Sequence, residues 1–255
     1  MRSRSLVLAL ALLAPPALPP AARADAVPIG SLHCNDAGGA PKLAGRAVTV
    51  AGVVVGQFSS ARNLRLFVQD ATGAVCVFGA PRNCVPVGDS VRVTGVLTGY
   101  NGLTEITGSA ATPLALDTLG RAARVPAPLA LTLAQVLATA QPDGCEPDES
   151  RLIAVDGVRV LAGGGAPLPP GATFADNTNY RLVAGADTSA YVVLRVTDPE
   201  GCDLSRSLEG QPIPVGPARV VGILSQYTGR GMTSGGYQIL PRSRDDVGAA
   251  GNAKH

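Results

Sequence analysis

The sequence predicts an all-β protein built from two small closed β-barrels in tandem, each of five strands, with a short connecting helix. Three observations lead to this fold class. Short runs rich in Val, Ile, Leu and Thr alternate with polar residues, Gly, Pro, Asn and Asp separate these runs, and the chain repeats part of itself. Because strands of this kind bury alternate side chains, each repeat can enclose a small core of its own.

The alternation is clearest in the run LRLFVQD, which begins at Leu64. Successive side chains of an extended chain point to opposite faces. We therefore expect Leu64, Leu66 and Val68 to face a core, and Arg65 and Phe67 to face outward.

The next residues predict a hairpin and a further strand. The turn DATG at 70–73 separates the first run from AVCVF, an arrangement typical of a β-hairpin. In VRVTGVL, Val91, Val93 and Leu97 share one side and are expected inward, whereas Arg92 is expected outward.

Two blocks of sequence recur in the second half of the chain. VTVAGVVV at 48–55 matches IAVDGVRV at 153–160, and RVTGVLTGY at 92–100 matches RVVGILSQY at 219–227. The matched blocks lie further apart in the second copy, which indicates a duplicated domain with longer loops and argues against a regular solenoid. Each block carries a glycine at the same place, which predicts a bend or bulge in a long strand.

The one strong helix signal lies at 132–140. Thr132 and Gln135 fit a capping box, and Leu133 and Val136 share one stripe, so we expect a short helix packed on one barrel.

The predicted division of the chain is a signal peptide at 1–26, a first barrel domain at 27–125, a linker with the short helix at 126–148, a second barrel domain at 149–247 and a disordered tail at 248–255.

The N-terminal segment has the order of a secretory signal. A basic start precedes an apolar run from Leu6 to Ala14, and small residues then suit cleavage after Ala24 or Ala26. This run is shorter than the roughly 20 residues that span a bilayer, and no later stretch approaches that length. We expect the mature chain to be secreted or periplasmic, with no membrane span.

Removal of that signal changes the charge. Three of the 21 Lys and Arg residues and one of the 19 Asp and Glu residues lie within it, which leaves 18 of each. A neutral mature chain gains no large attraction to phosphate backbones, which argues against generic nucleic-acid binding. Only residues 27–130 lean positive, with eight basic and five acidic side chains.

Five cysteines occur in a chain expected to reach an oxidising compartment, where disulfides persist. No Cys-x-x-Cys pair or Cys/His cluster exists, so we expect no zinc site and no cofactor. Our proposed pairing joins Cys145 with Cys202 and Cys34 with Cys84 and leaves Cys76 buried in a strand, although sequence alone does not fix connectivity.

Three segments now identify a likeness to a known family. GRAVTVAGVV, LFVQDATGAVCVFG and VGDSVRVTGVLTGYNGLTEI resemble the OB-fold modules of bacterial secreted proteins, which often stand beside extracellular nuclease or phosphatase-like domains. The second copy, with PIPVGPARVVGILSQY, is similar to a variant of the same module. The resemblance covers nearly all of the mature chain and implies two OB-fold-like five-stranded barrels. It brings no catalytic residues, because the family has no universal ones.

Histidine usage argues against an enzyme. The chain holds only His33 and His255, whereas general acid–base and metal-assisted catalysis most often use histidine. We expect His33 to lie in an exposed lead-in loop and the acidic residues of 146–149 and 245–246 to be solvated. No catalytic or metal-binding residue is predicted.

Binding residues are better represented. OB barrels use the outer surface of their second and third strands to hold single strands or sugars, and single strands require aromatic faces and guanidinium groups. The candidate ligand-binding residues are Arg62, Arg65, Phe67, Arg92, Tyr100, Arg181, Tyr191, Arg195 and Tyr227. Outward Arg and aromatic side chains also stabilise any exposed sheet by cross-strand pairing, so both interpretations stay open.

Two classes of binding function remain. One is binding of single-stranded DNA or RNA through the OB-fold surfaces, and the other is an accessory or scaffold role that binds a secreted or cell-surface protein or a glycan. An accessory part in an extracellular nuclease system is a lesser alternative. Convergence of Arg62, Arg65 and Arg92 with Phe67 into one groove would favour nucleic acid, and scatter of these residues would favour the scaffold role. An aromatic content of 4% and only two lysines count against nucleic acid.

Overall fold

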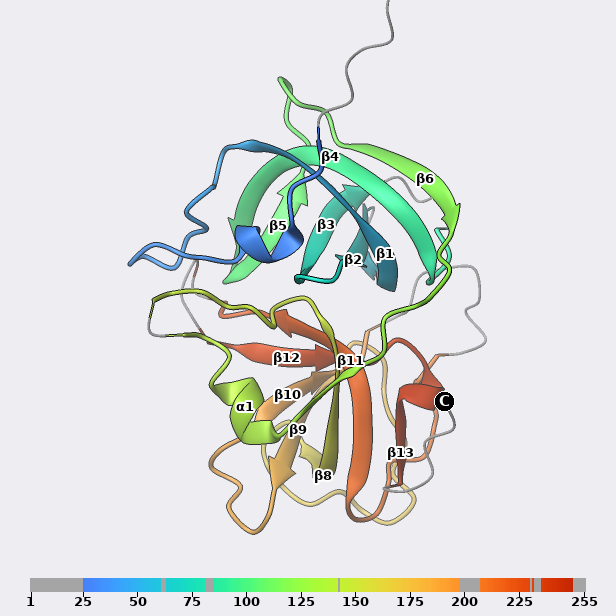
Figure 1. The fold of residues 1–255 in the computed structure, drawn as a ribbon. Coiled ribbons are helices and arrows are strands. Elements are labelled where there is room, and N and C mark those ends of the chain that lie inside the picture. The colour runs from blue at the N-terminus through green and yellow to red at the C-terminus, as the bar shows by residue number, and fades with distance from the viewer. Residues whose placement is uncertain are drawn as a thin grey trace, which may run out of the picture.

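The computed structural model describes residues 25–60, 63–80, 85–141, 143–197, 207–229, 231 and 235–249. Nearly all of the predicted signal peptide and the end of the predicted tail lie outside these ranges. Two β-barrels stand one above the other, with the N-terminal barrel at the top of Figure 1. None of the helices within the described ranges has the length and apolar character that crossing a membrane requires.

The first sheet closes on itself. Its strands are β1 (Ala47–Ser60), β2 (Asn63–Gln69), β3 (Ala74–Ala80), β4 (Asp89–Tyr100), β5 (Leu103–Thr107) and β6 (Ala115–Arg121). They are hydrogen-bonded in the order β1-β2-β3-β5-β4-β6, and β4 also pairs with β1. The pairing of β4 with β1 closes β1 to β5 into a ring. In this ring β3 and β5 run parallel and the other neighbours run antiparallel, an arrangement of the OB type.

The second sheet has the same order. Its strands are β7 (Leu129–Leu131), β8 (Leu152–Ala162), β9 (Asn179–Ala184), β10 (Val192–Arg195), β11 (Ala218–Gln226), β12 (Tyr237–Leu240) and β13 (Val247–Ala249). The ring runs β8-β9-β10-β12-β11 and closes through β11 and β8, with β10 and β12 parallel. β7 and β13 extend it, and β7 comes from the segment between the two rings.

The two rings share one strand order, and the repeated blocks fall at equivalent places in it. The first pair of matched blocks lies in β1 and β8, and the second pair lies in β4 and β11. The bulge in β1 falls between Val54 and Gly56. The matched glycines Gly95 and Gly222 instead mark close approach, because a Cβ there would lie 2.6 Å from a carbonyl oxygen of the neighbouring strand.

Each barrel has its own apolar core. The inward residues expected in β2 and β4, including Leu66 and Val93, are buried in the first core together with Ile29 of the short 3₁₀ helix η1 (Ile29–Leu32). The second core includes Leu133 and Val136 of α1 (Leu133–Leu137), which packs against that barrel as predicted.

The predicted capping box of α1 is present, but the helix is shorter than 132–140. Thr132 accepts the backbone N–H of Gln135, and the Gln135 side chain accepts the backbone N–H of Thr132. The helix ends at Leu137, and beyond it the Thr139 hydroxyl donates to the carbonyl of Val136 at 2.9 Å.

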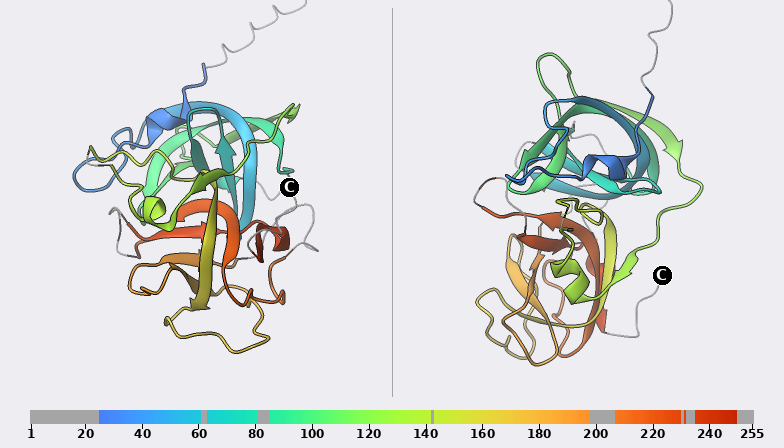
Figure 2. Two further views of the ribbon diagram at one scale, coloured as in Figure 1. Left: turned by 60° about the horizontal axis from the view of Figure 1, so that its bottom comes forward. Right: turned by 60° about the vertical axis from the view of Figure 1, so that its left-hand side comes forward.

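A third apolar cluster joins the two barrels, which touch along their facing sides in the views of Figure 2. Among the described residues, its members from the first barrel are Val55, Phe58, Phe67, Cys76 and Leu103. Its members from the second barrel are Leu152, Ala154, Val221, Ile223 and Leu240. These side chains sit on the outer faces of both rings, so the outer face of β2 and β3 is partly covered by the second barrel.

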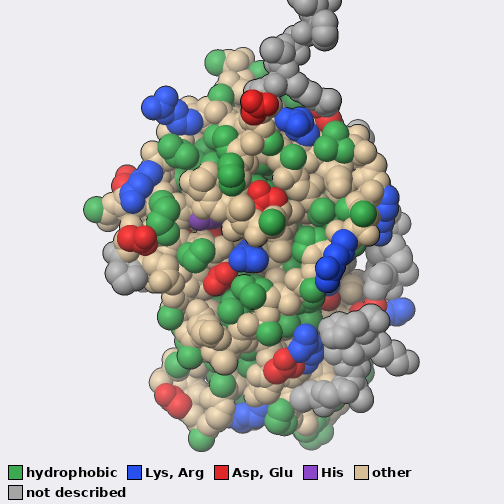
Figure 3. All heavy atoms as spheres, viewed as in Figure 1, with side chains coloured by type: hydrophobic (Ala, Val, Ile, Leu, Met, Phe, Trp, Pro, Cys, Tyr) green, Lys and Arg blue, Asp and Glu red, His purple; other side chains and the backbone are tan. Residues whose placement is uncertain are grey.

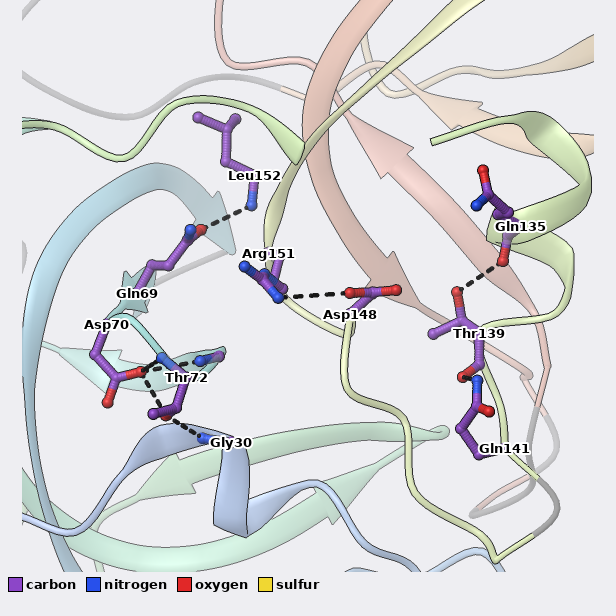
Figure 4. Close-up of polar contacts among 11 residues, drawn as sticks. Gly30, Gln69, Asp70, Thr72, Gln135, Thr139, Gln141, Asp148, Arg151 and Leu152 are labelled. Atoms are coloured by element: carbon purple, nitrogen blue, oxygen red, sulfur yellow. Dashed lines mark hydrogen bonds and ion pairs between the residues drawn. The ribbon is translucent and has the colours of Figure 1, made fainter. Parts of the chain in front are cut away.

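Hydrogen bonds fix the relative position of the barrels. The Gln69 side chain at the end of β2 accepts the backbone N–H of Leu152 at 3.0 Å, as Figure 4 shows. Arg242 donates to the carbonyl of Val55 at 3.3 Å. At the opposite end of the contact, the backbone N–H of Thr228 donates to the carbonyl of Asn101 at 2.8 Å.

The structure contradicts the predicted disulfides. Cys34 is bonded to Cys145, so neither Cys145 with Cys202 nor Cys34 with Cys84 can form; Cys84 and Cys202 lie outside the described residues. The lead-in segment forms an antiparallel bridge with the linker, which places the two cysteines opposite each other across a separation of 111 residues. Cys76 is a buried free thiol, as predicted.

Gly56 permits the close approach of the barrels. A Cβ at this position would lie 2.8 Å from Cγ1 of Ile223 in the second barrel and 3.3 Å from the ring of Phe58. Ile223 is fully buried and β-branched, so it has little freedom to move aside.

We expect Gly56→Val to lower the free energy of unfolding by about 1–3 kcal/mol, because the added side chain overpacks the contact between barrels. Chemical denaturation monitored by circular dichroism would measure this loss. Gly164→Val is the matched control, since a Cβ at Gly164 meets no atom within 4 Å. Equal stability of the two variants would contradict the role of Gly56.

Candidate functional site

One predicted ligand-binding residue is placed wrongly by the sequence analysis. Phe67 is 0% exposed and packs at 5.8 Å, centroid to centroid, on Phe58 within the cluster between the barrels. Its side chain does point away from the first core, as its parity predicted. The second barrel occupies the space where solvent was expected, so Phe67 cannot stack on a ligand.

Arg92 does not converge with Arg65 and Phe67. Arg62 lies outside the described residues, and Arg92 stands near the start of β4, opposite Ala51 of β1. Gly99, which lines the cavity described in the next paragraph, lies seven residues further along the same strand. The arrangement of these residues that would have favoured nucleic acid is therefore not present.

Arg65 instead meets two other predicted residues. Arg65, Tyr100 and Tyr227 line a cavity of about 350 Å³ at the junction of the barrels, which we call the junction groove. Its further lining includes Phe78, Glu105, Gln226 and Gln238. The floor of the groove is the outer face of β2 to β5, beside the apolar contact between the barrels. One wall is formed by the end of β11, by Tyr227 directly after it, and by β12.

Tyr100 and Tyr227 form an exposed aromatic pair. Tyr100 ends β4 of the first barrel, and Tyr227 directly follows β11 of the second, so the two occupy equivalent places in the repeat. Their ring centroids are 6.5 Å apart, and 59% of Tyr100 and 53% of Tyr227 remain exposed. The pair presents flat apolar faces to solvent at the groove.

Two arginines from different barrels lie close to each other, and one of them, Arg65, lines the groove. Burial lowers the pKa of Arg195 on β10, the nearby charge of Arg65 lowers that pKa further, and the charge of Asp176 opposes both effects. Arg195 is held by neutral oxygens, donating to the Asn177 carbonyl at 2.8 Å and to Oδ1 of Asn179 at 3.2 Å. Nε of Arg65 is buried and has no hydrogen-bond partner within the described ranges. Since like charges repel, an anion between these guanidinium groups would relieve an unfavourable interaction.

The outer face of the second barrel extends this surface. Arg181 of β9 stands opposite Val193 of β10, which in turn stands opposite Gln238 of β12 in the groove lining. The guanidinium carbon of Arg181 lies 4.1 Å from the ring centroid of Tyr191, a cation–π contact. The predicted residues of the second barrel thus flank one continuous face of β9, β10 and β12.

Glu105 lies at the floor of the groove and was not predicted. It faces outward from β5, in register with Thr98 on one side and Cys76 on the other, and only 5% of it is exposed. Burial raises the pKa of Glu105 to about 7, against the opposing effects of the hydrogen bond from Cys76 and the charge of Arg65. Glu105 shares one side of β5 with Leu103 and Thr107, and this alternation in the sequence could have placed its carboxyl group on the outer face.

The acidic segment 146–149, expected to be solvated, is partly buried. Oε1 of Glu146 accepts the Tyr237 hydroxyl at 2.6 Å, and its Oε2 accepts the Asn35 amide at 2.9 Å. Oε1 of Glu149 accepts the backbone N–H of Thr104 at 3.0 Å. These carboxyl groups join the linker to the lead-in and to both barrels, and burial raises the pKa of Glu146.

His33 is also buried, contrary to the expectation of an exposed loop. Its Nδ1 lies 2.7 Å from Oε2 of Glu149, and only 1% of the residue is exposed. Neither side chain is accessible to a substrate. The pair instead links the segment before β1 to the segment before β8.

Within the described ranges, His, Cys, Asp and Glu side chains form no group of three or more that could hold a metal ion. Lys and Arg side chains are scattered over the face shown in Figure 3 and do not merge into a stripe. The junction groove combines aromatic rings, guanidinium groups and one poised carboxyl group.

Glu105→Gln is expected to stabilise the protein at high pH. A pKa raised on folding means that the native state binds the proton more tightly, so stability is highest below about pH 4.5 and falls as pH rises through 7. Removing the ionisable group should raise the free energy of unfolding, relative to wild type, by about 3 kcal/mol at pH 8.

Denaturation of both proteins at pH 5 and pH 8 measures this change. Glu209→Gln, at an exposed carboxyl group, serves as the control. A wild-type-to-variant difference that stays constant between the two pH values would show that Glu105 is not destabilised by burial.

Comparisons with known proteins give partial structural likeness only. No protein-family model and no curated protein sequence matches the chain. Asparaginyl-tRNA synthetase from Pyrococcus horikoshii is 22% identical over 34% of this chain and 23% of its own, with a TM-score of 0.27. OBody AM1L10 bound to hen egg-white lysozyme is 22% identical over 31% of this chain and 84% of its own, with a TM-score of 0.25. A replication protein A heterotrimer bound to ssDNA is 11% identical over 58% of this chain and 38% of its own, with a TM-score of 0.23. We draw no functional conclusion from TM-scores this low.

Proposed function

We propose that this chain is an exported, non-catalytic protein that binds single-stranded nucleic acid in the junction groove and along the adjoining face of β9, β10 and β12. The observation that carries the proposal is the position of Tyr100 and Tyr227 beside Arg65 at a cavity formed by both barrels. Every base has a π-face, so exposed aromatic rings bind single strands without reading their sequence.

The charges support the same ligand. Arg65 and Arg195 approach each other closely enough that the charge of one lowers the pKa of the other. A phosphodiester between them would be attracted to both, and guanidinium groups match phosphate oxygens through paired hydrogen bonds. Arg181 and Tyr191 offer a second pairing of charge and ring further along the face.

Export is supported by the basic and apolar pattern before residue 25 and by the disulfide between Cys34 and Cys145. Disulfides persist in the periplasm and outside the cell, whereas cytosolic thiols are kept reduced. The buried, internally paired state of Glu146, Glu149 and His33 supports a binding role, because it removes these groups from contact with a substrate.

We expect a fluorescent twelve-nucleotide oligothymidylate to bind the mature protein at low salt, with affinity measured by fluorescence anisotropy between 20 and 200 mM NaCl. Tyr100→Ala with Tyr227→Ala should weaken binding by about five- to a hundredfold, because each base loses a stacking partner. Arg65→Ala with Arg195→Ala should make the salt dependence shallower, since each lost phosphate contact lowers the slope by about 0.7.

Arg92→Ala is the matched control, because it removes an arginine of the same barrel outside the groove lining. It should leave affinity within about twofold. Absence of binding at 20 mM salt, or an equal loss in the Arg92 variant, would overturn the proposal. Binding of a neutral oligosaccharide in place of DNA, without salt dependence, would instead assign the aromatic pair to a glycan.

A further inference from the structure

The floor of the junction groove carries polar groups that single-strand binding does not require. A groove that only stacks bases and neutralises phosphates needs rings and cations. This groove also places Glu105 between Thr98 and Cys76 on the outer face of the first barrel, where keeping its carboxyl group is costly. The carboxyl group has a described hydrogen bond only from the Cys76 thiol, at 3.6 Å from sulfur to Oε1.

We propose that the junction groove is a base-recognition pocket that takes one guanine of the bound strand, with Glu105 and Arg65 reading its edges. This inference rests on the proposed function, and it names the base that the same site selects. The cavity of about 350 Å³ is large enough for one purine, which enters beside Tyr100 and Tyr227.

The choice of base follows from the arrangement of donors and acceptors. The two oxygens of a carboxylate accept two neighbouring N–H donors, and guanine alone offers such a pair on its Watson–Crick edge, from N1 and the 2-amino group. Adenine and cytosine present a donor beside an acceptor, and thymine presents one donor between two acceptors. Unpaired bases in single strands expose these edges to side chains.

Arg65 complements the other side of the same base. Guanine carries two acceptors, O6 and N7, and paired hydrogen bonds from arginine to these atoms are the commonest specific contact between proteins and DNA bases. The Arg65 guanidinium lies close enough to Glu105 to lower its pKa, without an ion pair between them among the described contacts. One acid and one guanidinium facing the same cavity match one donor edge and one acceptor edge.

The preference for guanine should depend on pH. Only the ionised Glu105 accepts from both donors, and its pKa of about 7 means that ionisation increases between pH 6 and pH 8. The groups that act on Glu105 are the Cys76 thiol of β3, Arg65 of β2 and Glu149, which lies three residues before β8. Burial raises the pKa of the Cys76 thiol well above its ordinary value, so Cys76 stays protonated throughout this range.

The test compares three twelve-nucleotide strands: oligothymidylate, the same strand with one central guanine, and the same strand with hypoxanthine, which lacks the 2-amino group. At pH 8 we expect the guanine strand to bind about tenfold more tightly than oligothymidylate, and hypoxanthine to lose most of that gain. At pH 6 the guanine preference should shrink to about threefold.

Glu105→Gln separates recognition from binding. At pH 8 this variant should lose the preference for the guanine strand over oligothymidylate, whatever its affinity for oligothymidylate, whereas Glu209→Gln should keep that preference. Circular dichroism and the stability measurement described above establish that the variant is folded.

Two results would overturn the inference. Equal affinity of wild type for the guanine and thymine strands would remove base selection while leaving single-strand binding intact. Affinity for free deoxyguanosine monophosphate equal to that for the guanine strand would assign the pocket to a mononucleotide. Failure to bind any strand would overturn the proposed function itself.

Discussion

The apolar contact between the two barrels determines which surfaces a ligand can reach. Burial of a large apolar side chain stabilises a fold by about 1.5–3 kcal/mol, and this contact buries Phe58, Phe67 and Ile223 together with smaller neighbours. It covers the part of the first barrel where OB modules commonly bind ligands. The proposed binding surface therefore lies at the edge of the contact and on the second barrel, where side chains of both barrels meet.

The sequence predicted the local features because they depend on near neighbours. Alternation in β2 and β4, the capping box of α1 and the duplicated blocks all appear as expected. The parity of Phe67 was correct, but parity does not distinguish solvent from a second domain. Only the packing of one copy against the other decides that Phe67 is buried and that Arg65, two residues earlier, is left at the groove.

The same limit applies to the site. Tyr100, Tyr227 and Arg195 could be predicted as binding residues from exposed strand positions, but their meeting depends on how the barrels are stacked. Glu105 was missed because a single acidic residue in a strand has no local signal of burial. Its raised pKa is a product of the same contact that covers Phe67, so docking of the barrels and the chemistry of the groove are physically coupled.

The disulfide also changes how the chain carries mechanical load. Tension applied at the two chain ends passes from Cys34 to Cys145 through the sulfur–sulfur bond, so it bypasses every strand of the first barrel. The load then falls on η1, which precedes Cys34, and on strands β8 to β13, which follow Cys145. Strands β1 to β6 stay outside the covalent path of the force as long as the bond remains oxidised.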